Sequence, residues 1–276
     1  MSEYNMEEIF MEKKLLKRSL TFAMMIAVVF STIIASSLIK ANAAETEKAV
    51  TLIQGEKTSQ YDTVQEAVAA VSADKTQAVI TLNKDFEGAG AVVKKDQNIV
   101  FNLNGFTWTI NSLVGSSGTE TNGVQLLQGS TVTIENGTLT SKTASKLIQN
   151  YCDLTIRNAT LSGQDNLTEI IVSNNNGSTV ITGNSTVQAA AGGIAFDSDK
   201  WGGYQGGNVT LEDGQVIGNV NATNGGKISL NGGTVTGDVI ASNYTYQGNE
   251  KTPANIVIDG ATINGNVTAQ NVGNIS

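Results

Sequence analysis

The sequence predicts an all-β protein: a right-handed parallel β-helix, or solenoid of short strands, with an N-terminal capping helix. Three observations predict this class. The composition is rich in turn-forming and β-branched residues, with 29 glycines, 1 proline and no histidine in 276 residues. A unit of alternating apolar residues and a turn recurs seven times, at uneven steps. Units that cannot bury their own apolar side chains are expected to stack on their neighbours.

The N-terminal residues 1–43 predict a secretory signal peptide. A basic cluster at residues 13–18 precedes an apolar run at residues 20–39, and small residues follow in the stretch ANAAE. This order is typical of an exported and cleaved segment. Met11 is a possible true start, because the ten residues before it carry acids and no base. The alternative is an uncleaved membrane anchor, since the run is nearly long enough to span a bilayer.

Without its signal, the chain carries 12 Lys and Arg residues against 21 Asp and Glu residues, a net charge of −9. This acidity argues against nucleic acid or anionic lipid as partners bound through bulk charge, and no membrane contact is expected after signal cleavage. Cys152 is the single cysteine, so an internal disulfide and a thiolate metal cluster are excluded. An exported chain without a disulfide favours a secreted protein at a bacterial cell surface.

The cap is expected in residues 44–82, as a strand, a helix and a second strand. The stretch YDTVQEAVAAVSADK places apolar side chains on one helix face, and Thr63 with Glu66 predicts a capping box. A strand is expected at residues 78–82. Such a cap covers the open end of the first coil and protects a sheet edge.

The coils are expected in residues 83–276. Each unit has two apolar residues flanking a third residue, then an Asn, Asp or Gly corner, a small residue and a further apolar anchor. Alternation turns one row of side chains inward, and the corner residues tolerate positive φ. Steps of 19 to 31 residues between units favour coils with loops of different length. The seven units are Phe101–Trp108, Val132–Leu139, Leu154–Leu161, Val180–Val187, Val209–Val216, Ile228–Val235 and Ile256–Ile263, with Phe106 and Thr182 departing from the pattern.

Three further stretches, GNVNATN, GDVIASN and GNVTAQN, predict one more strand in three successive coils. Their valines and alanines are expected to point inward and stack. The Asn or Asp after each first glycine is expected to stack at the corner, with side-chain hydrogen bonds along the axis. The stacked residues are Val220, Val239 and Val267, with Ala222, Ala241 and Ala269 beside them.

The stretches TVQEAVAAV, AVITLNKDF and NIVFNLNGFTWTI resemble the opening of pectate-lyase-like right-handed β-helix domains in large bacterial surface and adhesin-like proteins. The resemblance covers roughly residues 48–276 and implies the β-helix fold. It leaves the function open, because that family includes lyases, hydrolases, adhesins and stalks.

This chain lacks most of the residues that the enzymes of that family use for catalysis. Its hydrolases share a Gly-His-Gly and an Arg-x-Lys, but this chain has no histidine, and Arg157 is the only arginine after the signal. Histidine-based triads and metal sites are excluded for the same reason. Its lyases use Ca²⁺ and an Arg or Lys base against a sugar C5 proton. Arg157 is expected at an outward position near Glu135, which favours a surface ion pair over a catalytic base.

Candidate binding residues lie in Gly192–Asn208, a stretch that interrupts the repeat and is expected to be a long loop. Asp197 and Asp199 could give two carboxylates to one Ca²⁺. Trp201 and Tyr204 offer flat apolar faces for a sugar ring. The alternative is that Trp201 folds back over the coils as a local core.

A second loop, Asn243–Ala254, carries Tyr244 and Tyr246. If both loops leave the same corner, the four aromatic side chains form one shelf for glycan.

Outward threonines raise ice binding as another function. The expected outward row contains Thr133, Thr155 and Thr210, but it is interrupted by Asn102, Ile181, Ser229 and Val257. This row therefore does not predict an ice-binding surface.

The leading functional interpretation is a secreted or cell-surface, adhesin-like and non-catalytic module. Such a module binds a polysaccharide or host glycan, or acts as a rigid spacer. The alternative is a Ca²⁺-dependent polysaccharide lyase with a lysine base, and a third interpretation is a stalk without ligand. The sequence ends at NVGNIS within the repeat, so either it is a fragment of a longer protein or its last coil meets a protein partner.

Overall fold

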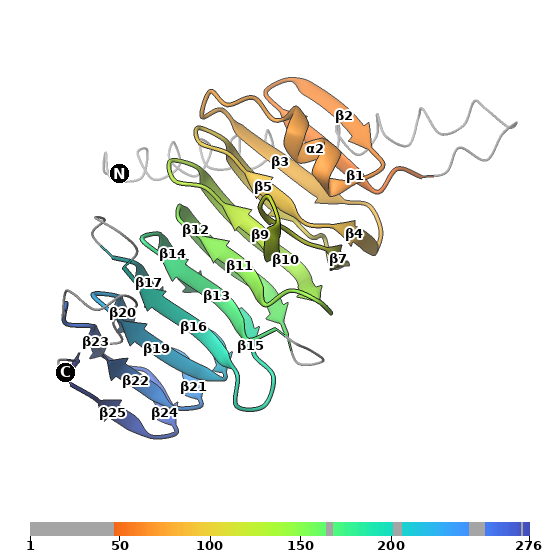
Figure 1. Ribbon diagram of the computed structural model, residues 1–276. Helices are drawn as coiled ribbons and strands as arrows, with labels where there is room; N and C mark the ends of the chain where they lie inside the picture. Colours follow the sequence, from red (N-terminus) through yellow and green to blue (C-terminus); the bar gives the residue numbers. More distant parts are fainter. Residues whose placement is uncertain (1–46, 164–167, 201–205, 243–251, 272) are drawn as a thin grey trace, which may run out of the picture. The chain divides into compact units, whose positions relative to one another are not determined.

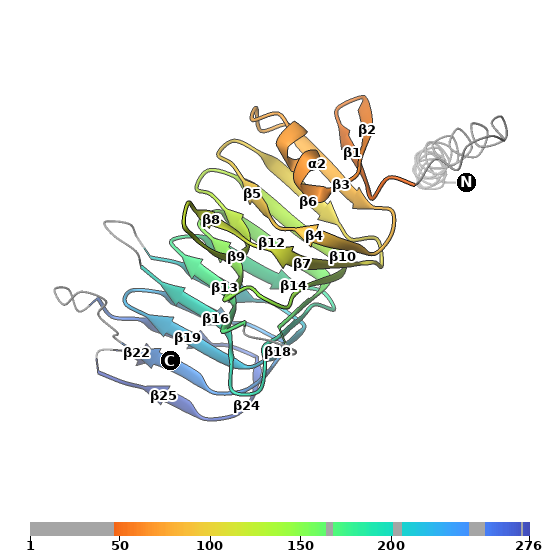
Figure 2. The ribbon, with the colours of Figure 1, turned by 45° about the vertical axis from the view of Figure 1, so that its right-hand side comes forward.

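Short β-strands make up most of the described chain. The computed structural model describes residues 47–163, 168–200, 206–242, 252–271 and 273–276, so the signal peptide expected at residues 1–43 lies outside the described residues. Residues 47–276 cluster as one unit. Along this unit the strands are arranged so that the colours progress in sequence order from one end to the other (Figures 1 and 2). The expected all-β class is confirmed. Within the described ranges, no helix is long and apolar enough to cross a membrane.

The strands form three parallel stacks, in which each strand pairs with its counterpart in the next repeat. The first stack contains β3 (Gln77–Leu82), β6 (Asn98–Asn102), the first halves of β10 (Thr131–Ser141) and β12 (Asp153–Ser162), β14 (Ser178–Thr182), β17 (Asn208–Leu211), β20 (Lys227–Leu230), β23 (Asn255–Ile258) and β26 (Asn274–Ile275).

The second stack shares the two long strands with the first. It contains β4 (Phe86–Ala89), β7 (Thr107–Ser112), the second halves of β10 and β12, β15 (Thr186–Gln188), β18 (Gln215–Ile217), β21 (Thr234–Thr236) and β24 (Thr262–Asn264).

The third stack forms a separate sheet. It contains β5 (Ala91–Val93), β9 (Thr119–Leu126), β11 (Lys146–Asn150), β13 (Ile170–Asn175), β16 (Ile194–Asp199), β19 (Asn219–Thr223), β22 (Val239–Ser242) and β25 (Val267–Ala269), with β8 (Val114–Ser116) antiparallel to β9.

Buried columns of side chains run through each stack, because alternate residues of a strand point to the same face. Trp108 is buried as expected, and its ring lies 5.6 Å from that of Phe101. One buried column of the first stack consists of Ala78, Ile99, Val132, Leu154, Thr179, Val209, Ile228 and Ile256.

The first of the seven expected units is in a different register. Phe101, and not Leu103, pairs with Ile134. The extra residues form a wider turn in which Asn104 and Gly105 both have positive φ. Leu103 is nevertheless buried, so a shift of two residues keeps the same side chains inward.

The fourth unit is shifted by one residue, so the expected inward positions of Val180 and Thr182 are wrong. Thr179 and Ile181 point inward instead. The Thr179 hydroxyl donates a 2.8 Å hydrogen bond to Oδ1 of Asn174. This bond satisfies a polar group at a core position, where an unpaired hydroxyl would be costly.

A residue with positive φ turns the chain at each expected corner. Asparagine and glycine adopt this conformation with the least strain. In the fourth unit the corner lies at Gly183 and not at Asn184, in line with the shifted register. The corner residues are Asn104, Gly105, Asn136, Asn158, Gly183, Gly214, Gly233 and Gly260.

The three GNV-type stretches contribute strands to the third stack, as expected. Val220, Val239 and Val267 pair in register, and so do the three alanines. Val267 is 48% exposed because it lies in the last strand of this stack. The corner ladder is also present: Asn219 Oδ1 accepts from the Asp238 amide at 3.0 Å, and Asp238 Oδ1 accepts from the Asn266 amide at 2.9 Å.

The expected helix is confirmed as α2 (Val64–Ala70), with the capping box of Thr63 and Glu66 at its start. The helix follows an antiparallel hairpin of β1 (Val50–Gln54) and β2 (Lys57–Tyr61), and β1 also pairs with β3. At its other end, the buried Gln97 amide donates 3.0 Å hydrogen bonds to the carbonyls of Val68 and Val71. These bonds satisfy carbonyls that a helix end leaves open.

A buried asparagine ladder lies between the third and first stacks. Asn150 and Asn174 are fully buried, and Nδ2 of Asn150 donates to Oδ1 of Asn174 at 2.7 Å. Asn150 Oδ1 accepts from the Cys152 amide at 2.9 Å, and Asn174 Nδ2 donates to the Gly177 carbonyl at 2.8 Å. The two amides therefore satisfy the backbone where the chain turns from one stack to the next.

Candidate functional site

The candidate residues Asp197 and Asp199 lie in strand β16, so the long loop expected from Gly192 is wrong for residues 194–199. Phe196 and Ser198 point inward and are buried, whereas the two aspartates point to the outer face. Phe196 pairs with Val172 and Val220, which fixes this register. The sheet therefore holds both carboxylates on one face, two residues apart.

Polar side chains of the neighbouring strands surround the two aspartates. Asp197 lies beside Ser173 of β13 and Asn221 of β19, and Asp199 lies beside Asn175 of β13. We call this outward-facing group the polar patch; it comprises Lys146, Gln149, Ser173, Asn175, Asp197, Asp199, Asn221 and Thr223, from four adjacent strands. Gln149, Ser173 and Asn175 are at most 8% exposed, and the other five residues are half-buried.

Hydrogen bonds connect most of the patch across the strands. Lys146 donates from Nζ to Gln149 Oε1 at 3.1 Å, and Gln149 Nε2 donates to Asn175 Oδ1. Asn175 Oδ1 also accepts from the Ser173 hydroxyl at 3.0 Å, while Asn175 Nδ2 donates to Asp199 Oδ1. The chain of bonds leads from a cation on β11 to a carboxylate on β16.

Asp197 is held separately, by a 3.3 Å hydrogen bond from the Thr223 hydroxyl to its Oδ1. Beside it, Oδ1 of Asn221 is buried and has no hydrogen-bond partner among the described residues. A buried acceptor without a partner is uncommon in folded proteins.

The carboxylates of the patch are harder to ionise than ordinary aspartates. The pKa of Asp199 is raised to about 7, mainly by burial and then by the neighbouring Asp197, while Lys146 acts in the opposite direction. Burial also raises the pKa of Asp197, against the Thr223 hydrogen bond and Lys146. The pKa of the Tyr151 hydroxyl, directly after β11, is raised by burial and then by the charge of Asp199.

Asp197 and Asp199 are the two carboxylates of the patch that could coordinate a cation. Asp197 and Asp199, with the oxygens of Asn221 and Thr223, are oxygen donors of the kind that Ca²⁺ prefers. Within the described ranges, no group of three or more His, Cys, Asp or Glu side chains is placed to hold a metal ion. Ca²⁺ binding at Asp197 and Asp199 therefore stays a prediction.

The four aromatic candidates cannot be placed on the patch. Trp201 and Tyr204 follow Asp199 closely in the sequence, and Tyr244 and Tyr246 follow β22, but all four lie outside the described residues. Their glycan contact stays a prediction.

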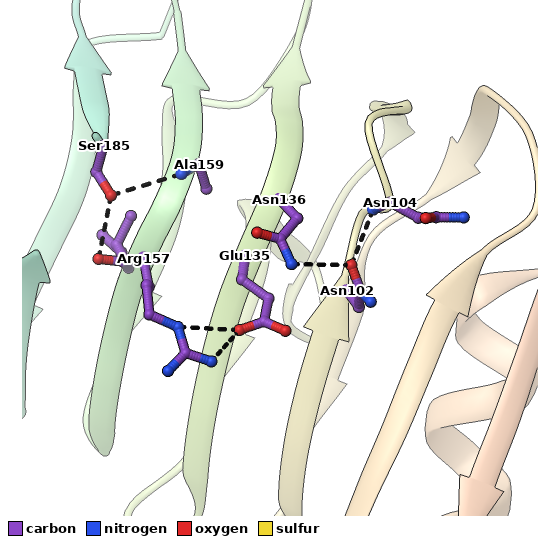
Figure 3. A network of polar contacts seen from close by, with 8 residues as sticks. Asn102, Asn104, Glu135, Asn136, Arg157, Ala159 and Ser185 are labelled. Atoms are coloured by element: carbon purple, nitrogen blue, oxygen red, sulfur yellow. Dashed lines mark hydrogen bonds and ion pairs between the residues drawn. The ribbon is translucent and has the colours of Figure 1, made fainter. Parts of the chain in front are cut away.

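Arg157 forms the expected ion pair with Glu135 on the outer face of the first stack. The two residues are direct partners in adjacent strands. Figure 3 shows the guanidinium reaching Glu135 Oε2, with a 3.1 Å bond from Nε and a second bond from a terminal nitrogen. The Arg157 side chain is 53% exposed. Because this arginine is exposed and already paired with a carboxylate, its role is a surface ion pair between adjacent strands.

The same view shows how side chains complete the neighbouring corners (Figure 3). Asn102 Oδ1 accepts from the Asn104 amide at 3.0 Å and from Asn136 Nδ2 at 3.3 Å. The Ser185 hydroxyl donates to the Ile156 carbonyl at 3.2 Å and accepts from the Ala159 amide at 3.5 Å. These contacts stabilise the fold.

Most residues of the patch escaped the sequence analysis. The repeat template describes the first and second stacks, while the third stack follows a different pattern in the stretches IQNY, VSNN, FDSD and VNAT. Each stretch has an apolar residue, an outward polar residue, a small or amide residue and, in three of them, a second small or polar outward residue. Aligning these four stretches would have brought Gln149, Asn175 and Thr223 next to the two aspartates.

Searches against models of protein families, curated proteins and solved structures found no match to this chain.

Proposed function

We propose that the chain forms a right-handed parallel β-helix and acts as a secreted, adhesin-like and non-catalytic module at a bacterial cell surface, with the polar patch binding a glycan. The signal-like N-terminus and the resemblance to pectate-lyase-like surface domains support the location. The polar patch supports the binding.

The path of the chain supports the coil. After β12 the chain enters the third stack in β13, the first in β14, the second in β15 and the third again in β16, and this order repeats through β17, β18 and β19. A chain that visits three parallel stacks in constant order advances as a helix of strands. Parallel connections within a sheet are right-handed in nearly all proteins, which supports the proposed hand.

The single observation that carries glycan binding is the hydrogen-bonded set of Gln149, Asn175 and Asp199, with Asp197 beside it on the same face. Carboxylates and amides are the groups that bind sugar hydroxyls, since they offer acceptors and donors side by side. The bonds between strands fix the side chains before a ligand arrives, so little rotamer entropy is lost on binding.

The test is a polysaccharide and glycan array probed with the full chain, once with Ca²⁺ and once with a chelator. We expect specific binding that is lost in Asp197→Asn and kept in Glu212→Gln, an exposed acid outside the patch. Loss of binding in Trp201→Ala would place the aromatic loop beside the patch. Binding in the Ca²⁺ buffer alone would assign the cation to Asp197 and Asp199.

A blank array in both buffers contradicts the binding proposal and leaves the rigid spacer as the better account. The variants are compared only if their far-UV circular dichroism and thermal midpoint equal those of the parent chain. Binding that survives Asp197→Asn would move the glycan site away from the patch.

A second candidate is a polysaccharide lyase, which one observation favours. A carboxyl group whose pKa is raised to about 7, beside a second carboxylate and Lys146, is a feature that clusters at functional sites. In this alternative Lys146 is the candidate base and the aspartates hold Ca²⁺ against a uronate. Incubation with uronate polymers would then produce unsaturated, ultraviolet-absorbing ends in Ca²⁺, and Lys146→Ala would abolish them.

A further inference from the structure

Two columns of outward, uncharged and mostly hydroxyl-bearing side chains run along the second stack from β7 to β24. Each of these strands places one outward residue on each side of a buried one, as in the Thr-x-Thr of β7 and β10. The first column contains Thr107, Thr138, Thr160, Thr186, Gln215, Thr234 and Thr262, and the second contains Thr109, Thr140, Ser162, Gln188, Ile217, Thr236 and Asn264. We call this surface the threonine face.

None of these fourteen positions, from β7 to β24, is charged, although 15% of the chain is charged. In β4, the first strand of the stack, the outward residue paired with Thr109 is Glu87. The outer face of the first stack, built in part from the same two strands, carries Asp153, Glu135 and Arg157. The polar patch carries Lys146 and two aspartates. Since β-propensity alone would enrich threonine on all three faces, the absence of charge from β7 to β24 sets this part of the second stack apart.

The geometry of the face is regular in two directions. Neighbouring strands of a sheet lie about 4.8 Å apart, and residues two apart in a strand are separated by roughly 6.6 Å. Threonine has few χ1 rotamers, because its Cβ is branched, so each methyl and hydroxyl group is held at a defined place. Each hydroxyl can both donate and accept a hydrogen bond; that of Thr140, for example, donates to the Ser162 carbonyl at 2.8 Å and can still accept.

This array differs from the outward row that the sequence analysis considered. That row, with Thr133, Thr155 and Thr210, belongs to the first stack, where Val180 and Val257 interrupt it. The threonine face lies on the strand segments that follow the corner of each repeat, in the second stack. Its first column is interrupted at one of seven strands, by Gln215, and its second column at three, by Gln188, Ile217 and Asn264.

We propose that the threonine face binds ice, by matching its rows of hydroxyl and methyl groups to the water positions of an ice surface. A lattice of water repeats in two dimensions, as the face does. Charged groups hold their own hydration shells and resist incorporation into a lattice, and their absence fits this ligand. Among the described residues of the face there is no aromatic side chain on which a sugar ring would stack, which disfavours a glycan here. This inference does not depend on the glycan proposal, which concerns another face.

The test is the partitioning of the full chain into a slowly growing ice front, together with inhibition of ice recrystallisation. Thr160→Lys places a strongly hydrated ammonium in the centre of the face. Thr155→Lys is the matched control, because the same substitution is made at an outward threonine of the same strand, β12, on the first stack. We expect the parent chain and Thr155→Lys to be enriched in ice, and Thr160→Lys to be excluded as a non-binding protein is.

Exclusion of the parent chain from ice overturns the proposal, and so does an equal loss in the two lysine variants when both remain folded. Thr138→Lys and its control Thr133→Lys serve as a second pair if Thr160→Lys fails to fold. Binding to a neutral polysaccharide that Thr160→Lys abolishes, without enrichment in ice, would assign the face to that polymer and overturn ice binding. None of these results alters the array test of the polar patch.

Discussion

Asp199 shows how burial in a sheet surface changes the chemistry of one side chain. Its pKa of about 7 is raised mainly by desolvation and then by Asp197, whereas an unfolded chain gives aspartate a pKa near 3.9. The folded state therefore binds a proton that the unfolded state releases between about pH 4 and 7. The contribution of Asp199 to stability is fully present below about pH 4, and it is lost as the pH rises through about 7.

Replacing Asp199 with asparagine should remove this pH dependence. The neutral side chain can still accept the hydrogen bond from Asn175. We expect Asp199→Asn to be more stable than the parent by on the order of 1–2 kcal/mol at pH 8, and the two to be equally stable near pH 4. Urea unfolding at both pH values measures this difference. If the parent instead became more stable than Asp199→Asn as the pH rises, Asp199 would be ionised in the folded state without a loss of stability.

The buried amide of Asn174 is expected to be among the least replaceable side chains of the core. It accepts from Asn150 and Thr179 and donates to the Gly177 carbonyl. Asn174→Ala would remove one hydrogen-bond partner from each of these three groups and should cost about 2–3 kcal/mol. Asn184→Ala, at an exposed position, should change stability by less than about 0.5 kcal/mol. Equal unfolding midpoints of the two variants would contradict the role of the ladder.

At the scale of the element, corners show where side chains are limited by their neighbours. Gly137 and Ala159 are partners in adjacent strands. A Cβ at Gly137 would lie 2.5 Å from Leu103 Cβ and 2.5 Å from the Phe106 carbonyl oxygen. The first unit has a wider turn that fills this space, whereas the next corner accommodates a methyl group.

Gly137→Ala should therefore destabilise the chain by on the order of 2 kcal/mol, because the wider turn must move. The reverse change at the partner position, Ala159→Gly, should cost at most about 1 kcal/mol, through chain entropy. Thermal unfolding of both variants distinguishes packing from a general sensitivity of corners. A larger loss at Ala159 than at Gly137 would contradict the steric argument.

The sequence predicted elements where polarity alternates without ambiguity, and failed where it does not. Val220 and Val267 stack as expected because polar residues flank each of them, and the matching start of its stretch places Val239 in the same register although Ile240 follows it. In the fourth unit, Val180 and Ile181 are adjacent apolar residues, so alternation fits two registers one residue apart. The choice between them depends on Thr179, whose hydroxyl donates to Asn174 and accepts from Asn150, two residues of other strands.

The candidate site was predicted in part for the same reason. The Asp-x-Asp spacing identified Asp197 and Asp199, but glycines on both sides suggested a loop. Phe196 fills a column between Val172 and Val220 and makes the segment a strand. The contacts of Gln149 and Asn175 with the aspartates depend on pairing between strands that are distant in the sequence. A single sequence predicts such pairing only where its repeats can be aligned.

At the scale of the whole unit, residues 47–276, each strand depends on its immediate neighbours in the stack. Stability in such an array is a sum over repeats and the interfaces between them. Strands with partners on both sides, such as β12 and β14, should open less often than β25 and β26, which each pair with a single strand among the described residues.

Hydrogen exchange measures this gradient. The amides of Ile156 and Ile181 should exchange at least about tenfold more slowly than those of Val267 and Ile275, since local opening is easiest at the end of an array. Uniform protection along residues 47–276 would indicate global cooperativity, contrary to the nearest-neighbour picture.

The parallel pairing of the stacks has a mechanical consequence. Hydrogen bonds between strands run along the direction in which the repeats succeed one another, at about 4.8 Å per strand. A pull between the first and last repeats therefore loads the bonds of one interface at a time, as in a zipper, and a sideways pull shears many together. Under tension this unit should yield repeat by repeat at modest force, releasing slack in small steps, so that a tether built from it absorbs a sudden load before it breaks.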